Sequence, residues 1–462
     1  MSSLHDLYHA IGGTVRVPSG IRDARVVRLG HVATDSRQVE PGDVFWALSG
    51  THRDGVEFAG EAFARGAAGA VVHRPVEAPA DRWIVQVPDT LEALWHWAGW
   101  KRRRFPGHVI AVTGSVGKTT TRQMIHAVLA SRLKGTQSPR NYNNHVGLPL
   151  SMLQIEPDQD YAVLELGASG PGEIARLAGL CSPTIGVITQ VGDAHLGGFG
   201  SRLQIAEAKA ELLAALPLDG YAVLGDDPWL RRIARASQAP ITWVGRGADC
   251  DLAAADVQAD GGRLRFRVAD CRFSVPVWGR HHLTAALLAA GVGRLLGIGL
   301  ETSAQALERF AAVPMRCEVI ERRGATIIND AYNSNPTAMH AALELLRDFD
   351  APGRRIVVFG DMMDLGDEAL LRHRQLGGEV VTVCGADLLI ACGRFADDVV
   401  AAARAAGMPH ARAIPCRTPE ETLPYLGQAI LPGDVVLVKG SRALAMERIV
   451  EALEHYPQRR SA

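Results

Sequence analysis

Residues 108–125 read HVIAVTGSVGKTTTRQMI and combine a strand, a glycine loop and the start of a helix. The apolar, β-branched run at 109–112 is typical of a buried parallel strand. Gly114 and Gly117 follow it, and their backbone freedom lets consecutive N–H groups point at phosphate oxygens. The helix expected to begin near Lys118 adds the positive end of its dipole. The stretch therefore predicts a nucleoside triphosphate site.

The spacing of this loop is unusual. It spells G-x-x-G-K-T, with two residues fewer between the glycines than the common G-x-x-x-x-G-K-[ST] pattern, and Val112 stands where that pattern has its first glycine. We expect the ammonium of Lys118 to reach the β- and γ-phosphates and the hydroxyl of Thr119 to bind Mg²⁺. The alternative is a glycine turn with an exposed lysine, which the order of strand, loop, Lys-Thr and helix disfavours.

The composition is that of a globular protein with several domains. The chain has 462 residues, 47% hydrophobic and 21% charged, so two to four domains are expected. Its 49 Lys and Arg nearly balance its 50 Asp and Glu, which argues against a nucleic acid or membrane partner. The basic run at 101–104 is interpreted as a solvated helix end. Seven cysteines form no C-x-x-C pair, which argues against a zinc site or disulfides and fits the cytoplasm.

Three α/β regions are expected along the chain. Residues 1–106 alternate short helices and strands and end at the turn Phe105-Pro106-Gly107. Residues 107–312 alternate strands and helices, which indicates a mainly parallel sheet covered by helices. Within them, residues 252–277 carry the short alternating runs of antiparallel edge strands. Residues 313–462 contain strand candidates separated by helices and favour a Rossmann-like sheet.

Polar side chains follow several predicted strands, at the end of a parallel sheet where ligands gather. Glu165 ends the strand in AVLELGA and is either a Mg²⁺ ligand or a cap for the following turn. His195 follows the strand at 185–190 among glycines that let a ligand approach the backbone, although a lone histidine is more often structural. The segment NDAYNSNP at 329–336 is either a polar site or an Asx-rich turn closed by Pro336.

Lys209 lies on or beside the apolar stripe of a predicted helix, four residues after Ile205 and three before Leu212. Its amine is therefore either snorkelling to solvent or held with a lowered pKa. A neutral amine can react with CO₂ to form a carbamate, a carboxylate on a long stem that suits Mg²⁺. Composition alone favours snorkelling. Arg316 likewise is either an ordinary surface arginine or a residue that reaches a phosphate from the third region.

Together these stretches resemble the Mur ligase family, the ATP-dependent amide-bond ligases of bacterial cell-wall synthesis, over nearly the whole chain. TGSVGKTTT is similar to the family's T-G-[ST]-x-G-K-T-[TS]-[TS], which accounts for the short glycine spacing. DSRQVEPGDVFWAL with DGVEF resembles the uridine-nucleotide-binding first domain. NYNNHVGLPL, FGDMMDLG and VKGSRALAME resemble the branch that adds D-alanyl-D-alanine. DAYNSNP stands where the branch that adds the third residue carries D-Y-A-H-x-P.

The resemblance implies a ligase of peptidoglycan precursor synthesis that joins D-alanyl-D-alanine to UDP-N-acetylmuramoyl tripeptide through an acyl phosphate. It implies ATP and two Mg²⁺ ions as cofactors. It also implies a small α/β uridine-nucleotide domain, a central P-loop ATPase-like domain and a C-terminal Rossmann-like domain for the dipeptide, in a cytoplasmic monomer. The alternatives are a sister ligase that adds another amino acid or acts on folate, and a P-loop nucleotide switch without ligase activity.

The resemblance also assigns roles to particular residues. Those implied in catalysis are Lys118, Glu165, His195, Lys209 and Asp330. Those implied in holding ATP are Thr113, Gly114, Ser115, Val116, Gly117, Lys118, Thr119, Thr120, Asn144, His282, Arg316, Asp330 and Asn333. Those implied in substrate binding are Ser36, Arg37 and Asn335, and those implied in holding Mg²⁺ are Thr119, Glu165, His195 and Lys209. Because Lys209 matches a lysine that is carbamylated in several members, the resemblance reverses the interpretation from composition.

One stretch departs from the family pattern. The family commonly has G-x-H-N-x-x-N-A-L-A-A at the end of the central domain, with the first asparagine near the adenine, whereas this chain has GRHHLTAALLAA. His282 and Ala285 stand at the two asparagine positions. A histidine can hydrogen-bond or stack on adenine, but an alanine side chain forms no hydrogen bond. We therefore expect the contact with the base to differ from the family's.

Overall fold

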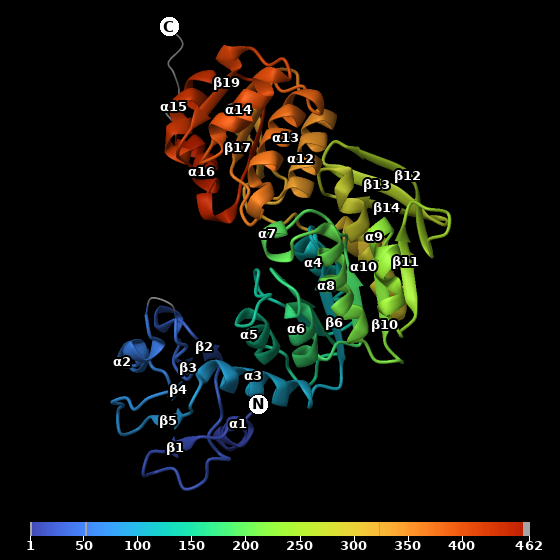
Figure 1. Cartoon of the computed structure of the whole chain (residues 1–462). Helices are drawn as coiled ribbons and strands as arrows, with labels where there is room; N and C mark the ends of the chain where they lie inside the picture. Colours follow the sequence, from blue (N-terminus) through green and yellow to red (C-terminus); the bar gives the residue numbers. More distant parts are fainter. Residues whose placement is uncertain (1, 51–52, 323, 456–462) are drawn as a thin grey trace. The chain divides into compact units, whose positions relative to one another are not determined.

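The computed structural model describes residues 2–50, 53–322 and 324–455. Three mostly parallel β-sheets with accompanying helices follow one another along the chain (Figure 1). The chain forms two compact units: residues 1–111, 133–167 and 174–185 make the first, and residues 112–132, 168–173 and 186–462 make the second. Across the described ranges, no helix is both long and apolar enough to cross a bilayer.

The first sheet has five strands in the order β1-β5-β4-β3-β2. Its strands are β1 (Thr14–Arg16), β2 (Val32–Ala33), β3 (Val44–Trp46), β4 (Gly69–Val72) and β5 (Trp83–Gln86), and its helices are α1 (Leu4–Ile11), α2 (Ala59–Ala64) and α3 (Thr90–Arg102). β1 runs antiparallel to β5, and the other pairs are parallel. Two apolar cores lie on it, one built around Trp46 and Trp83 and the other around Phe45 and Phe63.

The second sheet has nine strands in the order β14-β13-β12-β11-β10-β9-β6-β8-β7. Its strands are β6 (His108–Thr113), β7 (Gly135–Gln137), β8 (Tyr161–Glu165), β9 (Ile185–Ile188), β10 (Tyr221–Gly225), β11 (Ile241–Gly245), β12 (Leu252–Asp260), β13 (Arg263–Val268) and β14 (Cys271–Val275). The antiparallel strands predicted within residues 252–277 are confirmed as β12, β13 and β14, and the parallel pairing of β11 with β12 attaches them to the sheet.

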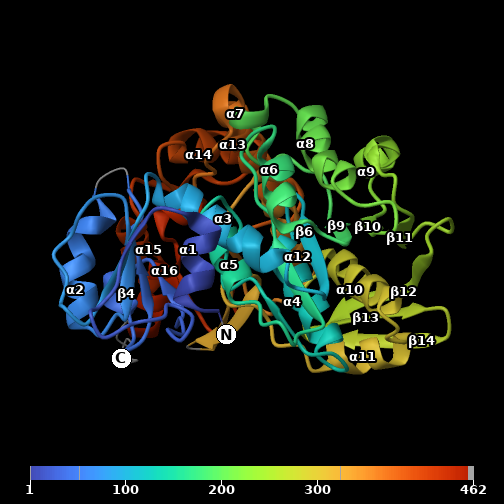
Figure 2. The same ribbon diagram turned by 90° about the horizontal axis from the view of Figure 1, so that it is seen from below.

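Eight helices accompany the second sheet in the described part of the chain. They are α4 (Lys118–Leu129), α5 (Gly147–Leu153), α6 (Glu173–Cys181), α7 (Leu196–Phe199), α8 (Arg202–Ala214), α9 (Pro228–Ile233), α10 (Leu283–Leu295) and α11 (Leu300–Glu308). α10 packs against α4, and α11 packs against β14, as Figure 2 shows from below. The helix expected to begin near Lys118 begins at that residue.

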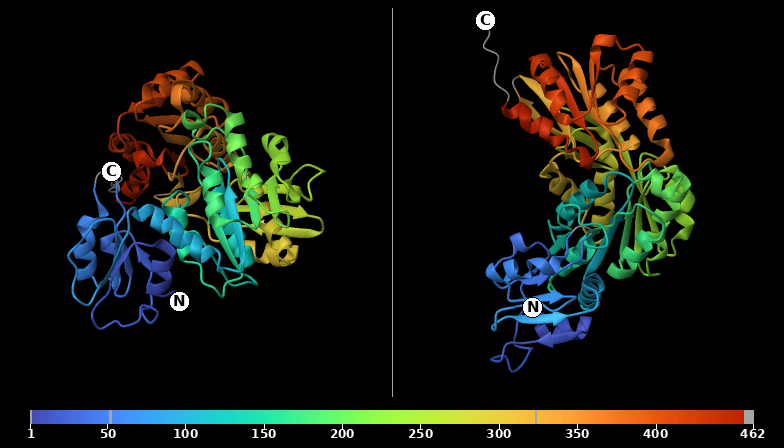
Figure 3. Two further views of the ribbon diagram at one scale, coloured as in Figure 1. Left: turned by 60° about the horizontal axis from the view of Figure 1, so that its bottom comes forward. Right: turned by 60° about the vertical axis from the view of Figure 1, so that its left-hand side comes forward.

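The third sheet has six strands in the order β15-β16-β20-β17-β18-β19. They are β15 (Glu318–Arg322), β16 (Ala325–Asp330), β17 (Arg355–Gly360), β18 (Leu388–Cys392), β19 (Ala413–Cys416) and β20 (Val435–Lys439). Its helices are α12 (Pro336–Asp348), α13 (Ala369–Thr382), α14 (Ala396–Ala405), α15 (Pro419–Ala429) and α16 (Glu447–His455). α15 and α16 cover one face, and α12 and α13 lie on the other (Figure 3). Only β15 is antiparallel to its neighbour, so the predicted Rossmann-like sheet is confirmed.

The basic run at 101–104 is the predicted solvated helix end only at Arg103 and Arg104, which are exposed, whereas Lys101 and Arg102 are half-buried. The Nζ of Lys101 donates to the carbonyl oxygen of Leu153 at 2.7 Å, and Arg102 donates to the carbonyl oxygen of Cys181 at 2.7 Å. Burial lowers the pKa of both Lys101 and Arg102. The charges of the run are visible in the sequence. The carbonyl groups that accept hydrogen bonds from Lys101 and Arg102 belong to segments far along the chain, so the sequence did not predict these contacts.

Gly69 provides a stability test of the first sheet. A Cβ at Gly69 would lie 2.0 Å from Cδ2 of the buried Trp83. We predict that Gly69→Ala destabilises this sheet by about 1–3 kcal/mol, because the indole must shift within a packed core. Gly60 in α2 has no atom within 4 Å of such a Cβ, so Gly60→Ala is the matched control and is expected to stabilise by roughly 0.5–1 kcal/mol.

Hydrogen–deuterium exchange of the full chain measures both effects, because it reports local opening of β4 and β5 separately from the rest of the protein. Faster exchange in Gly69→Ala and unchanged or slower exchange in Gly60→Ala are expected. Equal protection in the two variants would contradict the packing argument.

Candidate active site

The glycine loop between β6 and α4 adopts a backbone that only glycine accommodates easily at two positions. Gly114 has φ +148°, and a Cβ there would lie 1.8 Å from Oγ1 of Thr189. Gly117 has φ +81° and stands immediately before the first turn of α4. The N–H of Ser115 donates to the carbonyl oxygen of Gln190 at 2.9 Å, so the segment after β9 holds the loop in place.

The phosphate-binding residues proposed from the sequence all lie on this loop and the first turn of α4. They are Thr113, Gly114, Ser115, Val116, Gly117, Lys118, Thr119 and Thr120. The half-buried Lys118 donates from Nζ to the carbonyl oxygen of Gly114 at 2.8 Å. Its ammonium therefore lies over the loop, at the positive end of α4, where a phosphate group is stabilised.

Three nitrogen-bearing side chains influence one another beside this loop. Burial and the ammonium of Lys118 lower the pKa of Lys209 to about 7. The same two causes lower the pKa of His195, against the opposing effect of Asp364. His195 stands before α7 with φ +56°, and its Nδ1 lies 3.1 Å from Oδ2 of Asp364. A bound anion would relieve the repulsion between these groups.

The snorkelling interpretation of Lys209 is wrong. The residue is 4% exposed on α8, and its Nζ lies 6.0 Å from the centre of the Phe199 ring. A lysine amine with a pKa of about 7 is largely neutral just above neutral pH, which is the form that reacts with CO₂. The alternative interpretation, a buried amine with a lowered pKa, is therefore the one that agrees with the structure.

Arg316 is not an ordinary surface arginine. Its Nη2 donates to Oγ1 of Thr119 at 3.0 Å, and its guanidinium lies 4.2 Å from the centre of the Tyr332 ring. His282 is 8% exposed and lines a small cavity together with Thr120 and Arg316. These contacts bring Arg316 and His282 to the first turn of α4.

Asp330 is the last residue of β16 and forms a buried ion pair that the sequence analysis missed. Its Oδ2 lies 2.5 Å from Nζ of Lys439, the last residue of β20, and its Oδ1 accepts a hydrogen bond from the N–H of Cys317 at 3.2 Å. Lys439 also donates to the carbonyl oxygen of Asn333 at 2.9 Å. The sequence did contain a signal for Lys439, because this residue ends an apolar strand, as Glu165 does.

Asn335 fits the Asx-turn alternative for its segment. Its Oδ1 accepts a hydrogen bond from the N–H of Ala338 at 2.8 Å and caps α12, which begins at Pro336. The segment 329–336 therefore contains both the polar pair of Asp330 and an ordinary helix cap.

Asp193 is a second missed residue in the same compact unit. Its carboxylate is buried and accepts hydrogen bonds from Nε and Nη2 of Arg202 at 2.7 and 2.5 Å. Its N–H donates to Oγ1 of Thr337 in α12 at 3.0 Å, and Arg372 of α13 lies 3.5 Å away. Asp193 thus connects the segment after β9 with helices of the third sheet.

Glu165 and Asn144 belong to the other compact unit. The carboxylate of Glu165 is 2% exposed, and its Oε1 accepts a hydrogen bond from Nδ2 of Asn143 at 2.8 Å. Oδ1 of Asn144 accepts from the N–H groups of Val146 and Gly147 at 3.1 and 2.8 Å, so this side chain stabilises the start of α5. Asn143, which the sequence analysis did not single out in the run NYNN, therefore helps to orient Glu165.

Ser36 and Arg37 also lie in that unit, after β2. Oγ of Ser36 donates to Oε2 of Glu61 at 2.7 Å. Arg37 pairs with Asp35 through hydrogen bonds of 2.9 and 2.8 Å, while its side chain is 79% exposed. A guanidinium that is both oriented and exposed is available to an anionic ligand.

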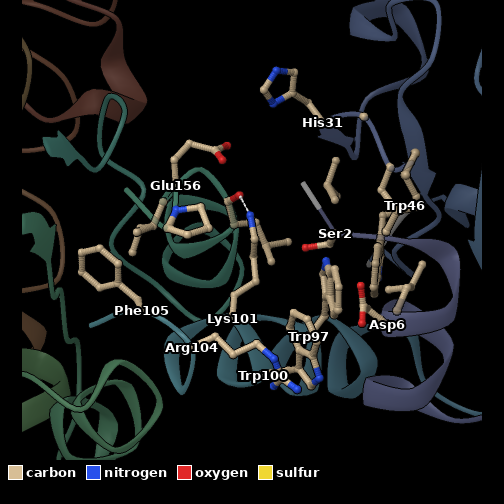
Figure 4. A pocket seen from close by; sticks show the side chains of 18 residues that line it. Ser2, Asp6, His31, Trp46, Trp97, Trp100, Lys101, Arg104, Phe105 and Glu156 are labelled. Atoms are coloured by element: carbon tan, nitrogen blue, oxygen red, sulfur yellow. Dashed lines mark hydrogen bonds between the residues drawn. The ribbon is translucent and has the colours of Figure 1, made fainter. Parts of the chain in front are cut away.

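A cavity of about 290 Å³ in this unit is lined by neither Ser36 nor Arg37. Figure 4 shows the aromatic rings of Trp46, Trp97 and Trp100 around it, with Lys101 donating its hydrogen bond on the opposite side. Arg104 lies 3.6 Å from the centre of the Trp100 ring. The cavity is thus separate from the residues assigned to the uridine nucleotide.

Three family models match the chain. The Mur ligase middle domain matches residues 112–293, the Mur ligase, glutamate ligase domain matches residues 315–442, and the model described as Mur ligase family, catalytic domain matches residues 28–99. Together they cover most of the three sheets.

Curated relatives match nearly the full length. UDP-N-acetylmuramoyl-tripeptide–D-alanyl-D-alanine ligase from Bacillus subtilis (strain 168) is 34% identical over 92% of this chain and 93% of its own. The protein of the same name from Escherichia coli (strain K12) is 34% identical over 93% and 94%, respectively. That from Mycobacterium tuberculosis (strain ATCC 25618 / H37Rv) is 35% identical over 96% of both chains.

Solved structures agree with these relatives. MurF from Acinetobacter baumannii superposes with a TM-score of 0.86 at 29% identity, over 98% of this chain and 99% of that chain. MurF ligase from Thermotoga maritima in complex with ADP superposes with a TM-score of 0.78 at 31% identity, over 92% and 97%. The matched domains, the sequence identity and the shared three-domain architecture lead to one conclusion: this chain belongs to the Mur ligase family.

Proposed function

We propose that this chain is an ATP-dependent ligase that joins D-alanyl-D-alanine to UDP-N-acetylmuramoyl tripeptide in peptidoglycan precursor synthesis. The observation that carries the proposal is the group formed by the glycine loop, Lys118, His195 and the buried Lys209. Relatives that are 34–35% identical over more than nine tenths of the chain, and that carry the name of this ligase, support the choice of substrates. A cytoplasmic monomer is proposed with it.

Each of the three ligands is assigned to one of the predicted domains. We assign the uridine nucleotide to residues 1–106 with Ser36 and Arg37, ATP to residues 107–312, and the incoming dipeptide to residues 313–462. Each of the three family-model matches lies within one of these ranges, which supports the assignment.

The chemistry requires activation because a carboxylate is a poor electrophile at neutral pH. An oxygen of the tripeptide's terminal carboxylate attacks the γ-phosphorus of ATP, the bond to the bridging oxygen breaks, and ADP leaves. The amine of D-alanyl-D-alanine then attacks the carbonyl carbon of the acyl phosphate, loses a proton, and inorganic phosphate leaves as the amide forms. Two anions meet in the first step, so the site must supply positive charge.

Particular residues meet this requirement. The loop N–H groups and the ammonium of Lys118 stabilise charge on the transferred phosphoryl group. Arg316 already donates to Thr119 and is positioned to contact the nucleotide phosphates. Asp330 orients Lys439 through their buried ion pair. Excluding water protects the acyl phosphate from hydrolysis.

Mg²⁺ fits the donor chemistry of the assigned residues. We propose that Thr119, His195 and carbamylated Lys209 hold it, since Mg²⁺ prefers oxygen ligands and the hydroxyl and the carbamate supply them. Beside the ammonium of Lys118, a carbamate on the otherwise neutral amine of Lys209 would add an anionic oxygen ligand for the metal. When bound, the metal neutralises phosphate charge.

The burial of Lys209 supports the proposed carbamylation. The neutral amine nitrogen attacks the carbon of CO₂ and forms an N–C bond, while one C=O π bond breaks and its electron pair moves to oxygen. The nitrogen then loses one proton to solvent. At a pKa of about 7 this amine is neutral over a pH range in which an ordinary lysine is protonated. Below about pH 7 the amine gains a proton, so the carbamate is lost as the pH falls.

Phosphate release tests the proposed reaction directly. With ATP, Mg²⁺ and UDP-N-acetylmuramoyl tripeptide, purified protein is expected to release phosphate continuously only when D-alanyl-D-alanine is added. Release that requires a different amino acid would assign the chain to a sister ligase. Release that ignores both peptide substrates would contradict ligase activity.

Replacing Lys118 tests the phosphate loop. We predict that Lys118→Ala lowers phosphate release at least about 10²–10³-fold, because a preorganised positive donor to the transferred group is lost. Lys134→Ala is the matched control, since that exposed lysine pairs with Asp158 at the surface, and it is expected to retain activity. Equal activity in the two variants would contradict the role of Lys118.

Replacing Lys209 tests the carbamate. We predict that Lys209→Ala is inactive and regains part of its activity with acetate or propionate, because a small carboxylate can take the place of the carbamate. Lys118→Ala should show no such rescue. Carbon-13 NMR of protein equilibrated with labelled bicarbonate should show a carbamate signal in the unaltered chain and none in Lys209→Ala; its absence from both would refute carbamylation.

A further inference from the structure

Two neighbouring histidines and a distant cysteine converge at one place in the second compact unit. His281 and His282 end the short turn Arg280–His282 before α10, and Cys317 lies directly before β15. Each offers one metal-ligating atom, and the three atoms lie within 4.8 Å of one another. The two imidazole rings have centroids 4.1 Å apart, and Sγ of Cys317 lies 3.6 Å from Nε2 of His281.

One pair in this group has the spacing of two ligands of a tetrahedral zinc ion. With Zn–S near 2.3 Å and Zn–N near 2.0–2.1 Å, a tetrahedral angle separates sulfur and nitrogen by about 3.6 Å. The Cys317–His281 pair already has this separation, and the ligating atom of His282 lies within 4.8 Å of both. A plain S–H···N hydrogen bond between Cys317 and His281 fits the same distance and is the alternative.

The ligand types and their exposure favour a particular ion. Two imidazoles and one thiol select a soft or borderline cation such as Zn²⁺ over Mg²⁺, which prefers oxygen. Cys317 and His282 are buried, whereas His281 is exposed and opens the group to solvent. Three protein ligands leave a fourth position for water or an external ligand.

The surrounding charges are mixed. Arg316 and Lys439 lie near the histidines and oppose a cation, while Asp330 accepts a hydrogen bond from the N–H of Cys317 and favours one. Burial raises the pKa of the Cys317 thiol well above its ordinary value, so the free thiol is protonated. Coordination displaces that proton and leaves a thiolate, whose charge offsets part of the repulsion.

We propose that His281, His282 and Cys317 form a binding site for a zinc-class divalent ion. The lack of a C-x-x-C pair argued against zinc in the sequence, but these ligands come from segments far apart in the chain. Such an ion would tie the turn before α10 to the segment that carries Arg316, the residue that donates to Thr119. The site does not depend on the proposed ligase activity.

Cobalt titration of the full chain tests the site, because Co²⁺ substitutes for Zn²⁺ and reports a thiolate ligand by charge-transfer absorption. After treatment with a chelator, one equivalent of Co²⁺ is expected to produce this band, Zn²⁺ to abolish it, and Mg²⁺ to leave it unchanged. Cys317→Ser should remove the band, and His282→Asn should weaken Co²⁺ binding at least about 10–100-fold.

Cys250→Ser is the matched control. Cys250 forms the other candidate group with Asp226 and Asp249, but Arg231 already lies 3.0 and 2.9 Å from those carboxylates and supplies the positive charge. This variant should keep the cobalt band. His281→Gln, at the exposed ligand, covers the case in which Cys317→Ser fails to fold. No band in the unaltered chain, or a band that survives Cys317→Ser or His281→Gln undiminished, would overturn the proposal.

Discussion

The buried amine of Lys209 is the constraint on which the proposed chemistry depends. Burying an ammonium is costly, and the positive charge of Lys118 adds to the cost, so the pKa of Lys209 falls to about 7. His195 experiences the same two influences. The second compact unit therefore gathers basic groups around the glycine loop, and a bound anion would offset their repulsion. A nucleotide, and a carbamate on Lys209, would each supply that negative charge.

Strand ends supply most of the remaining chemistry. Gly114 follows β6 of the second sheet. Asp330 ends β16 and Lys439 ends β20, and because these two strands are parallel neighbours, their ends meet at one edge of the third sheet. The segment 309–317 then joins the second sheet to the third and carries Arg316 to Thr119. Met315 and Cys317 have φ values of +57° and +52°, an uncommon conformation for residues with a side chain. This strained backbone also brings Cys317 to His281.

The fold class and the glycine loop could be predicted from the sequence because they depend on local patterns of residues. Apolar runs, glycine punctuation and alternation predicted the three α/β regions, the antiparallel strands within 252–277 and the start of α4. The edge strand β15 was missed because it is only partly buried and carries charged residues, and β19 because it is only four residues long and contains Pro415. The domain boundaries and the roles of Ser36 and Arg37 stay predictions.

The sequence by itself determined the fold class, the glycine loop and the family, since each is a pattern of neighbouring residues. Only the tertiary structure decided the state of individual side chains. Four features depend on residues distant in the chain. They are the burial of Lys209, the ion pair of Lys439, the hydrogen bond of Asn143 to Glu165, and the contact of His281 with Cys317. Desolvation and hydrogen bonding act on groups that are close in space, and spacing along a sequence does not report that closeness.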